Sequence, residues 1–303
     1  MFTGLMPAMV TPFDEQEEVD LQATKAVVER LIEARVDGVV ALGSNGEFSH
    51  LTSEERKRFA EEMVKLVAGR VPLVIGVGAS GTKETVELAR HAEDVGADGV
   101  IVVPPFYWKV GEETLFKHFA TVADSVDTPI LIYNFPMVTG IDLSPGLVAR
   151  VATECPNVAG LKDTVAEYSH LVNVLQEVKP VSPDFSVLVG FEDLILPGLL
   201  AGADGAISGL ANIAPKLFVG LIRAFEQGDL QKAADLHRRV LSLMALGAYS
   251  DPPIGAIKLA MNKLGVPISP TVRGPALPAP VEAHEKIEGV LRDMGSLSMG
   301  KAD

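Results

Sequence analysis

Eight short apolar runs, each followed by a longer amphipathic segment, are the feature of this sequence that most restricts its fold. The runs are rich in valine and isoleucine, and they lie at residues 5–11, 38–42, 72–77, 98–103, 129–133, 157–162, 185–190 and 204–208. Short apolar runs are typical of strands, and the amphipathic segments between them are typical of helices. Because the runs are almost continuously apolar, we expect strands that are buried on both faces, as in a parallel sheet covered by helices.

A repeated Asp-Gly turn supports this arrangement. VDGVV at 36–40, ADGVI at 97–101 and ADGAI at 203–207 each close an expected helix and open an expected strand. Glycine suits this position because a helix C-terminus often requires a positive φ. Eight such strand–helix units predict an α/β fold, a (β/α)8 TIM barrel.

The chain after residue 215 carries no further strand pattern. Its expected elements are helical segments at 216–227, 229–247, 254–264 and 280–294. We interpret the first as the last barrel helix. The sequence therefore predicts a barrel over residues 1–227 that carries the active site, and a C-terminal helical extension over residues 228–303.

Composition narrows the classes of function. The 303 residues carry a formal net charge of −14, so the surface would repel nucleic acid and anionic membranes. A small anionic substrate would then need a local positive group. The single cysteine, Cys155, excludes an internal disulfide framework, and no apolar stretch is long enough to cross a membrane. The N-terminal residues show no secretory signal pattern, so we expect a cytoplasmic protein.

A lysine ends the sixth apolar run, which reads VAGLKDT at 158–164. Lysines at strand ends commonly mark the exit into solvent, but the carboxyl ends of barrel strands also form the catalytic face. If Lys162 points inward, Val158 and Gly160 share its face and Asp163 faces the helices. An inward lysine is poorly solvated, which favours the neutral amine that attacks ketones to form a Schiff base.

Tyr133 ends the preceding run. If strands five and six are neighbours, Tyr133 and Lys162 stand side by side at the barrel mouth. A phenol there can relay protons to and from substrate. Taken alone, Tyr133 is better explained as a packed aromatic with a locally bonded hydroxyl. Its pairing with Lys162 favours the catalytic interpretation.

The second run leads into GSNGEF at 43–48. The Ser44 hydroxyl and the backbone N–H groups of Asn45 and Gly46 could converge on a carboxylate at the barrel mouth. Asn-Gly is also a common turn dipeptide, and such a segment taken alone is more often a simple tight turn. Glu47 fits two roles, an anchor for the loop or a contact to a ligand.

No metal site is predicted. The six histidines show no metal-ligand spacing with carboxylates, and most fall in expected helices where a solvated face explains them. Gly190 and Ser208 begin the segments GFEDL and SGLAN after strands seven and eight. Such segments can form the phosphate site common in barrels, but we favour a role in shaping room for a substrate tail.

Four ordered segments together resemble one enzyme family. They are FTGLMPAMVTPF at 2–13, GSNGE at 43–47, YNFPMVTG at 133–140 and GLKDT at 160–164. This set looks like the dihydrodipicolinate synthase and N-acetylneuraminate lyase family of pyruvate-dependent class I aldolases. The likeness runs from residue 2 to about residue 212, and more weakly through DPPIGAIK at 251–258.

The resemblance implies roles for particular residues. Lys162 matches the Schiff-base lysine that captures the pyruvate carbonyl, and Tyr133 matches the proton-shuttling tyrosine. Ser44 and Asn45 occupy the positions that bind the pyruvate carboxylate, and Ile207 matches a residue lining the pyruvate pocket.

The resemblance also implies an assembly. Tyr107 matches a tyrosine that in many members reaches toward the active site of a neighbouring subunit. Members are usually homotetramers arranged as dimers of dimers.

Two departures separate this chain from the synthases of the family. Synthases usually carry Thr-Thr where this chain has Ser44-Asn45, and an arginine where it has Val138. That arginine binds the carboxylate of aspartate semialdehyde, and valine cannot replace a charged bidentate donor. GSNGEF followed by LTSEER is similar to the 4-hydroxy-2-oxoglutarate aldolases, and a residue other than arginine at 138 also occurs in 2-keto-3-deoxygluconate aldolases.

We therefore predict a Schiff-base aldolase that cleaves a 2-keto-3-deoxy or 4-hydroxy-2-oxo acid to pyruvate and an aldehyde, with no metal and no organic cofactor. Three alternatives stay open. They are 4-hydroxy-tetrahydrodipicolinate synthase, a sugar-acid dehydratase of the same superfamily, and a barrel that binds pyruvate without turnover.

Overall fold

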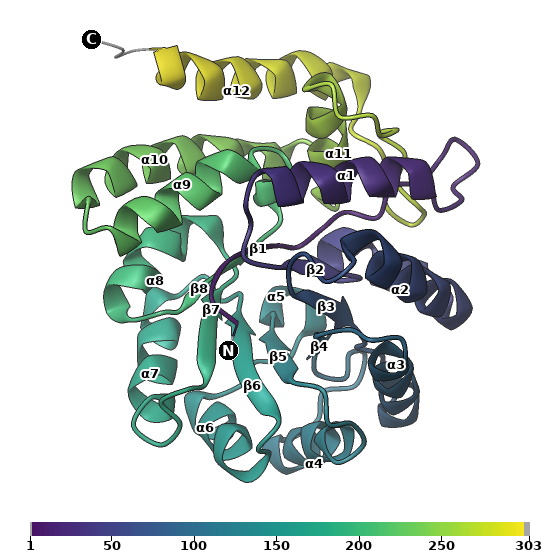
Figure 1. Cartoon of the computed structure of the whole chain (residues 1–303), viewed down its shortest axis with the longest axis vertical. Coiled ribbons are helices and arrows are strands. Elements are labelled where there is room, and N and C mark those ends of the chain that lie inside the picture. The colour runs from purple at the N-terminus through teal and green to yellow at the C-terminus, as the bar shows by residue number, and fades with distance from the viewer. Residues whose placement is uncertain (1, 300–303) are drawn as a thin grey trace.

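The computed structural model describes residues 2–299, and it confirms the eight strands. All lie in one parallel sheet that curves into a barrel with helices around it (Figure 1). The strands are β1 (Gly4–Pro7), β2 (Val39–Ala41), β3 (Leu73–Gly76), β4 (Gly99–Val102), β5 (Ile130–Asn134), β6 (Val158–Asp163), β7 (Ser186–Val189) and β8 (Gly205–Ser208).

Helices follow the strands as the periodicity predicts. Those of the barrel are α1 (Leu21–Glu33), α2 (Ser53–Val67), α3 (Thr82–Asp94), α4 (Glu112–Ala123), the short α5 (Pro136–Thr139), α6 (Pro145–Glu154), α7 (Tyr168–Val178), α8 (Ile195–Ala201) and α9 (Pro215–Glu226). Helix α2 illustrates the local signals. The Thr52 hydroxyl accepts a hydrogen bond from the Glu55 N–H, and the Glu55 carboxylate accepts one from the Thr52 N–H. This capping box satisfies donors that the first turn leaves free.

The strand order closes the barrel. Neighbours run β1-β8-β7-β6-β5-β4-β3-β2, and an isolated parallel bridge between Ala8 and Val40 joins the two ends. Strands β5 and β6 pair so that Tyr133 lies opposite Lys162 and Asn134 lies opposite Asp163. The register therefore places the two residues singled out in the sequence beside each other, at the carboxyl ends of adjacent strands.

Two separate apolar clusters stabilise the barrel. One lies between the sheet and the helices. The other fills the barrel interior and consists of Phe2, Met6, Ala8, Val40, Val74, Ile101, Val103, Leu131, Tyr133, Leu188 and Ile207. A filled interior means that substrate cannot pass through the barrel, so the chemistry must take place at its mouth.

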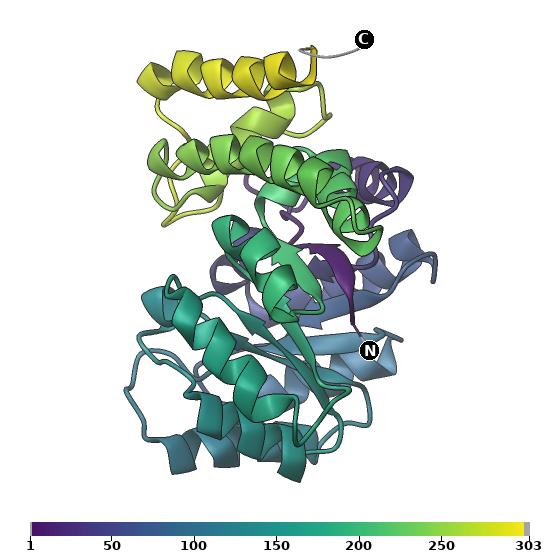
Figure 2. The same cartoon turned by 90° about the vertical axis from the view of Figure 1, so that its left-hand side faces the viewer.

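Three α-helices follow the barrel within residues 2–299, namely α10 (Leu230–Leu243), α11 (Ile254–Lys263) and α12 (Val281–Met299). Helix α10 packs on α9, and α12 packs on α10 and α11. Figure 2 shows α12 as the element farthest from the sheet, stacked beyond α10. The C-terminal helical segments are confirmed, whereas the division into two domains at residue 227 stays a prediction. No helix in the described part of the chain combines the length and apolarity that a membrane span requires.

Candidate active site

A cavity of about 690 Å³ opens at the carboxyl ends of the strands. Five residues selected from the sequence contribute to its wall: Ser44, Asn45, Tyr133, Lys162 and Gly190. They come from four different strand ends that are distant in sequence. Convergence of side chains from several strand ends is the arrangement found at active sites of (β/α)8 barrels.

Lys162 and Tyr133 form the centre of this cavity. Their side chains are almost fully buried, at 5% and 3% exposure, above the apolar interior of the barrel. The Lys162 Nζ lies 4.1 Å from the centroid of the Tyr133 ring. No carboxylate in the described part of the chain forms an ion pair with Lys162. The amine is therefore poorly solvated and open to a carbonyl carbon arriving from the cavity.

Aromatic packing fixes the orientation of Tyr133. The Phe135 ring stacks on it with centroids 5.8 Å apart, and Phe191 meets Phe135 edge-on at 6.0 Å. Both phenylalanines also line the cavity. Such contacts restrict the ring to one rotamer, which a proton-transferring phenol requires.

The Ser44–Asn45 loop adopts a single 3-10 turn, η1 (Ser44–Gly46). The Ser44 and Asn45 side chains both line the cavity. Gly209 makes room for them, because a Cβ at that position would overlap the Asn45 amide. Gly46 itself lies behind the wall, where its N–H donates to the Gly43 carbonyl and its carbonyl accepts from the Thr11 hydroxyl.

Glu47 anchors this loop, and both of its oxygens are occupied by the C-terminal segment. One carboxylate oxygen lies 2.5 Å from the Lys258 Nζ of α11, and the other accepts the Arg273 backbone N–H at 2.9 Å. Glu47 also takes a left-handed conformation, with φ of 54°. Of its two predicted roles, the structure therefore supports that of anchoring the loop. Glu47 is also one of the residues that line the cavity.

Thr164 was not selected from the sequence, yet it lines the cavity two residues after Lys162. Strand alternation explains its position on the same face. Its hydroxyl is buried and has no hydrogen-bond partner within the described residues. Gly190 creates the space for it, because a Cβ at residue 190 would overlap that hydroxyl. An unpartnered buried hydroxyl beside the lysine is available to a polar atom of a substrate.

Three other predicted site residues lie outside the cavity wall. Ile207 is fully buried in the barrel interior, beneath the cavity. Ser208 is buried, and its hydroxyl donates to Glu192 at 2.7 Å. Tyr107 is 87% exposed and does not contact the cavity of its own chain.

The C-terminal segment supplies a wall that the sequence did not reveal. Met244, Gly247, Ile254 and Ile257 close one side of the cavity, together with the turn at residues 251–253. Spacing could not identify these residues, because they meet the barrel only through tertiary packing. The weak likeness in DPPIGAIK at 251–258 was the one available signal.

The expectation that solvated helix faces explain most histidines was wrong. His118 and His237 are buried, and His170 has a side chain only 11% exposed. Each has a polar partner, namely the Thr82 hydroxyl, the Glu192 carbonyl and the Asp163 carboxylate respectively. Burial lowers the pKa of His118 to about 4. No cluster of three or more metal-binding side chains occurs within residues 2–299.

Comparison with known proteins identifies the family. Residues 1–294 match the model of the dihydrodipicolinate synthetase family, and this chain belongs to that family. The resemblance drawn from the four sequence segments is thereby confirmed.

Individual relatives refine this assignment. The chain is 41% identical over 296 residues to YjhH of Escherichia coli K12, described as a probable 2-dehydro-3-deoxy-D-pentonate aldolase, and the match covers 98% of each chain. A 4-hydroxy-tetrahydrodipicolinate synthase of Methanocaldococcus jannaschii is 37% identical over 295 residues, covering 97% of this chain and 99% of the relative.

A solved structure shows the same fold in detail. The crystal structure of the E. coli K12 prophage protein YagE, in complex with pyruvate, superposes with a TM-score of 0.96 at 41% identity. The match covers 97% of this chain and 99% of YagE. Together with the aldolase name of YjhH, this similarity confirms the prediction of an enzyme of the pyruvate-dependent aldolase type.

Proposed function

We propose that the protein is a class I aldolase that cleaves a 2-keto-3-deoxy sugar acid to pyruvate and a hydroxylated aldehyde through an imine on Lys162. The observation that carries this proposal is the register of Tyr133 and Lys162 across β5 and β6, in a cavity with no competing partner for the amine among the described residues. The pyruvate bound to YagE, which has the same fold, supports it.

The residues account for each step of a retro-aldol cleavage. The unprotonated Lys162 amine adds to the C2 carbonyl, and the Tyr133 phenol gives its proton to the departing C2 hydroxyl, so that water leaves and the protonated imine and a Tyr133 phenolate are formed. Tyr133 accepts the proton of the C4 hydroxyl as the C3–C4 bond breaks. The electron pair of that bond moves into the protonated imine to give an enamine, and the aldehyde leaves. Protonation at C3 and hydrolysis then release pyruvate and free Lys162. Ser44 and Asn45 hold the carboxylate throughout.

Charge around the cavity favours an aldehyde half without a distal anion. Among the lining residues within the described chain, only Lys162 and His50 can carry a positive charge, whereas Glu192 and Asp251 contribute carboxylates. Val138 stands where family synthases carry an arginine. A distal carboxylate or phosphate would therefore lose its hydration with His50 as its one possible cationic partner besides the imine lysine among the described lining residues, while hydroxyl groups could donate to Glu192 and Asp251.

A substrate panel tests this assignment. We expect pyruvate release from 2-keto-3-deoxy sugar acids with neutral tails, at a kcat/KM roughly 10²-fold above that for 4-hydroxy-2-oxoglutarate. Pyruvate with aspartate semialdehyde should give no condensation product. A preference for either charged substrate would overturn the proposal. Loss of water with no aldehyde formed would instead identify a sugar-acid dehydratase, and a pyruvate adduct without any turnover would identify a binding barrel.

Replacing Tyr133 with phenylalanine should slow cleavage by about 10²-fold or more, because the hydroxyl is lost while the Phe135 stacking partner stays in place. Borohydride in the presence of pyruvate should still label Lys162 in this variant. Steady-state kinetics and intact mass measure the two effects. An unchanged cleavage rate would remove Tyr133 from proton transfer.

We also propose a cytoplasmic homotetramer. Tyr107 and Trp108 pack edge-to-face 5.7 Å apart, and both are largely exposed, at 87% and 74%. An exposed aromatic pair of this kind is typical of a protein interface. Light scattering coupled to size exclusion measures the mass in solution, and a monomer would contradict the tetramer.

A further inference from the structure

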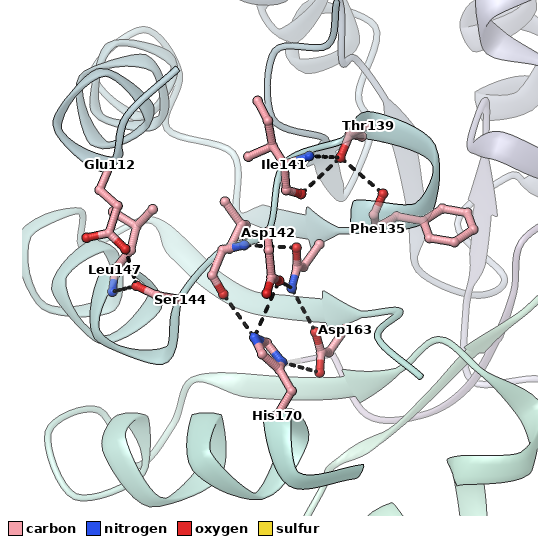
Figure 3. Close-up of polar contacts among 11 residues, drawn as sticks. Glu112, Phe135, Thr139, Ile141, Asp142, Ser144, Leu147, Asp163 and His170 are labelled. Atoms are coloured by element: carbon pink, nitrogen blue, oxygen red, sulfur yellow. Dashed lines mark hydrogen bonds and ion pairs between the residues drawn. The ribbon is translucent and has the colours of Figure 1, made fainter. Parts of the chain in front are cut away.

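A largely buried polar cluster, with only Asp142 half exposed, lies directly behind the catalytic pair, and no step of the proposed reaction uses it. It consists of Asn134, Asp142, Asp163 and His170, together with the backbone of Leu143 (Figure 3). Asn134 follows Tyr133, and Asp163 follows Lys162. Since side chains alternate along a strand, these two residues face the helices, whereas Tyr133 and Lys162 face the cavity.

Asn134 joins the two catalytic strands to the loop that follows α5. Its side-chain amide donates to Asp163 at 3.2 Å across the strands and to Asp142 at 2.8 Å. Its side-chain oxygen accepts the Leu143 N–H at 3.1 Å. Both donors of this fully buried amide and one lone pair of its oxygen are therefore used.

His170 of α7 completes the cluster. Its Nδ1 lies 3.0 Å from the Asp163 carboxylate and its Nε2 lies 3.1 Å from the Leu143 carbonyl. Carbonyl and carboxylate oxygens only accept hydrogen bonds, so both ring nitrogens must carry protons to satisfy both contacts. The geometry therefore selects the imidazolium form, and Leu143 is held twice, with its N–H donating to Asn134 and its C=O accepting from His170.

The loop held in this way continues directly from α5, and the two together, residues 135–143, are called the 135–143 loop below. This loop supplies Met137, Val138 and Thr139 to the cavity wall. The Thr139 hydroxyl stiffens the loop internally, because it donates to the Phe135 carbonyl at 3.0 Å and accepts the Ile141 N–H at 3.3 Å. A loop that is stiff inside moves as a unit, so its position depends on its anchor at residues 142 and 143.

We infer that Asn134, Asp142, Asp163 and His170 form a positioning cluster that sets the loop of residues 135–143 over the aldehyde half of the substrate, with His170 acting in its protonated form. The inference rests on the proposed aldolase function. It assigns no chemistry to these residues, and it predicts that they govern binding of the keto acid more than capture of pyruvate.

Charge around the ring supports protonation. Two carboxylates face His170. That of Asp163, on β6, lies 3.0 Å from the ring, and that of Asp142, in the loop after α5, lies 3.6 Å from it. Burial alone would lower the pKa of His170, but the Asp163 hydrogen bond, both carboxylate charges and the Leu143 carbonyl together raise it above the ordinary value. The ring is thus charged below about pH 6.5. The His170 contacts to Asp163 and to the Leu143 carbonyl weaken as the pH rises through the raised pKa.

The test compares His170→Gln with the wild type between about pH 6 and about pH 9, where histidine titrates. In the wild type, we expect KM for the keto acid to rise with pH. In His170→Gln, KM should be raised on the order of tenfold at pH 6 and should no longer change with pH, with kcat changing less. His91→Gln is the matched control, since His91 of α3 pairs with Glu61 of α2 at 3.2 Å, away from the cavity wall. A His170→Gln variant with the wild-type KM profile would overturn the inference.

A second variant covers the case in which His170→Gln fails to fold. Asp142→Asn keeps an oxygen for the Asn134 amide but removes one carboxylate facing His170, and Asp142 is half exposed. The pH at which KM rises should shift downward in this variant. An unshifted midpoint would contradict the cluster. Borohydride labelling with pyruvate separates this outcome from failure of the proposed function, because a wild type without an adduct would refute the aldolase itself.

Discussion

Replacing Lys162 with alanine is expected to abolish turnover and to abolish the pyruvate adduct formed under borohydride. Among the described residues that line the cavity, Lys162 is the only one with an amine that can form the imine, so the substitution removes the covalent route altogether. The residual rate should fall by at least about 10³-fold, as when a nucleophile is deleted. The measurements are pyruvate release, followed by intact mass and peptide mapping after reduction.

The fold should survive this substitution. Lys162 is nearly buried and makes no ion pair within the described chain, so its removal relieves a desolvated amine and breaks only the contact of its Nζ with the Tyr133 ring. Lys162→Arg is the control that keeps a positive charge at the cavity but cannot form the imine. Both variants should retain the wild-type circular dichroism and Tm. A Lys162→Ala enzyme with a near-normal rate would refute the class I mechanism.

The position of the adduct is itself a sharp test, because a second lysine is also poorly solvated. Burial lowers the pKa of Lys258 to about 8, although Glu47 opposes the shift. Lys258 nonetheless lies outside the cavity wall, and its Nζ is bound by Glu47 and the Thr271 carbonyl. Peptide mapping should therefore find the label on Lys162 alone.

Local patterns were sufficient for the barrel and for the centre of its site. Strands of three to six residues recur, each followed by a helix, so parallel pairing of successive units follows from connection rules. That pairing, with side-chain alternation, placed Tyr133 beside Lys162 and turned Asp163 toward the helices. The directions of these three side chains needed no knowledge of distant contacts.

Distant contacts explain what the sequence did not reveal. Glu47 meets Lys258, and Asp163 meets His170, through packing of separate elements that no local period encodes. A buried histidine has the same helical spacing as a solvated one, which is why the helix pattern misplaced His170. The roles of the predicted site residues stay predictions until the variants are measured.

The second large effect should come from Lys258→Met. The Lys258 and Glu47 side chains are 0% and 1% exposed, and they form an ion pair of 2.5 Å. Removing one partner leaves the other charge buried, which costs about 3–5 kcal/mol in the free energy of unfolding. Chemical denaturation measures this loss. Lys263→Met is the matched control on the same helix, because its ion pair with Glu288 is partly exposed and should contribute little to stability.

Stability should also respond to pH through this lysine. The folded pKa of Lys258 is about 8, below the value of about 10.4 expected in the unfolded chain. Between these values the unfolded chain binds more protons, so the wild type gains stability as the pH rises through this range. Methionine cannot titrate, and the stability gap between the wild type and Lys258→Met should therefore widen from about pH 8 to about pH 10.

The same substitution should weaken capture of pyruvate, because Glu47 carries the anchor of the Ser44–Asn45 loop. If the loop depends on this ion pair, Lys258→Met raises the pyruvate concentration needed for half-maximal borohydride labelling, whereas Lys263→Met leaves it unchanged. The double variant Glu47→Gln with Lys258→Met removes both charges and should be less destabilised than the sum of the two single variants. Additive losses would show that the two side chains do not interact. They would also show that the C-terminal helices do not support the Ser44–Asn45 loop through this ion pair.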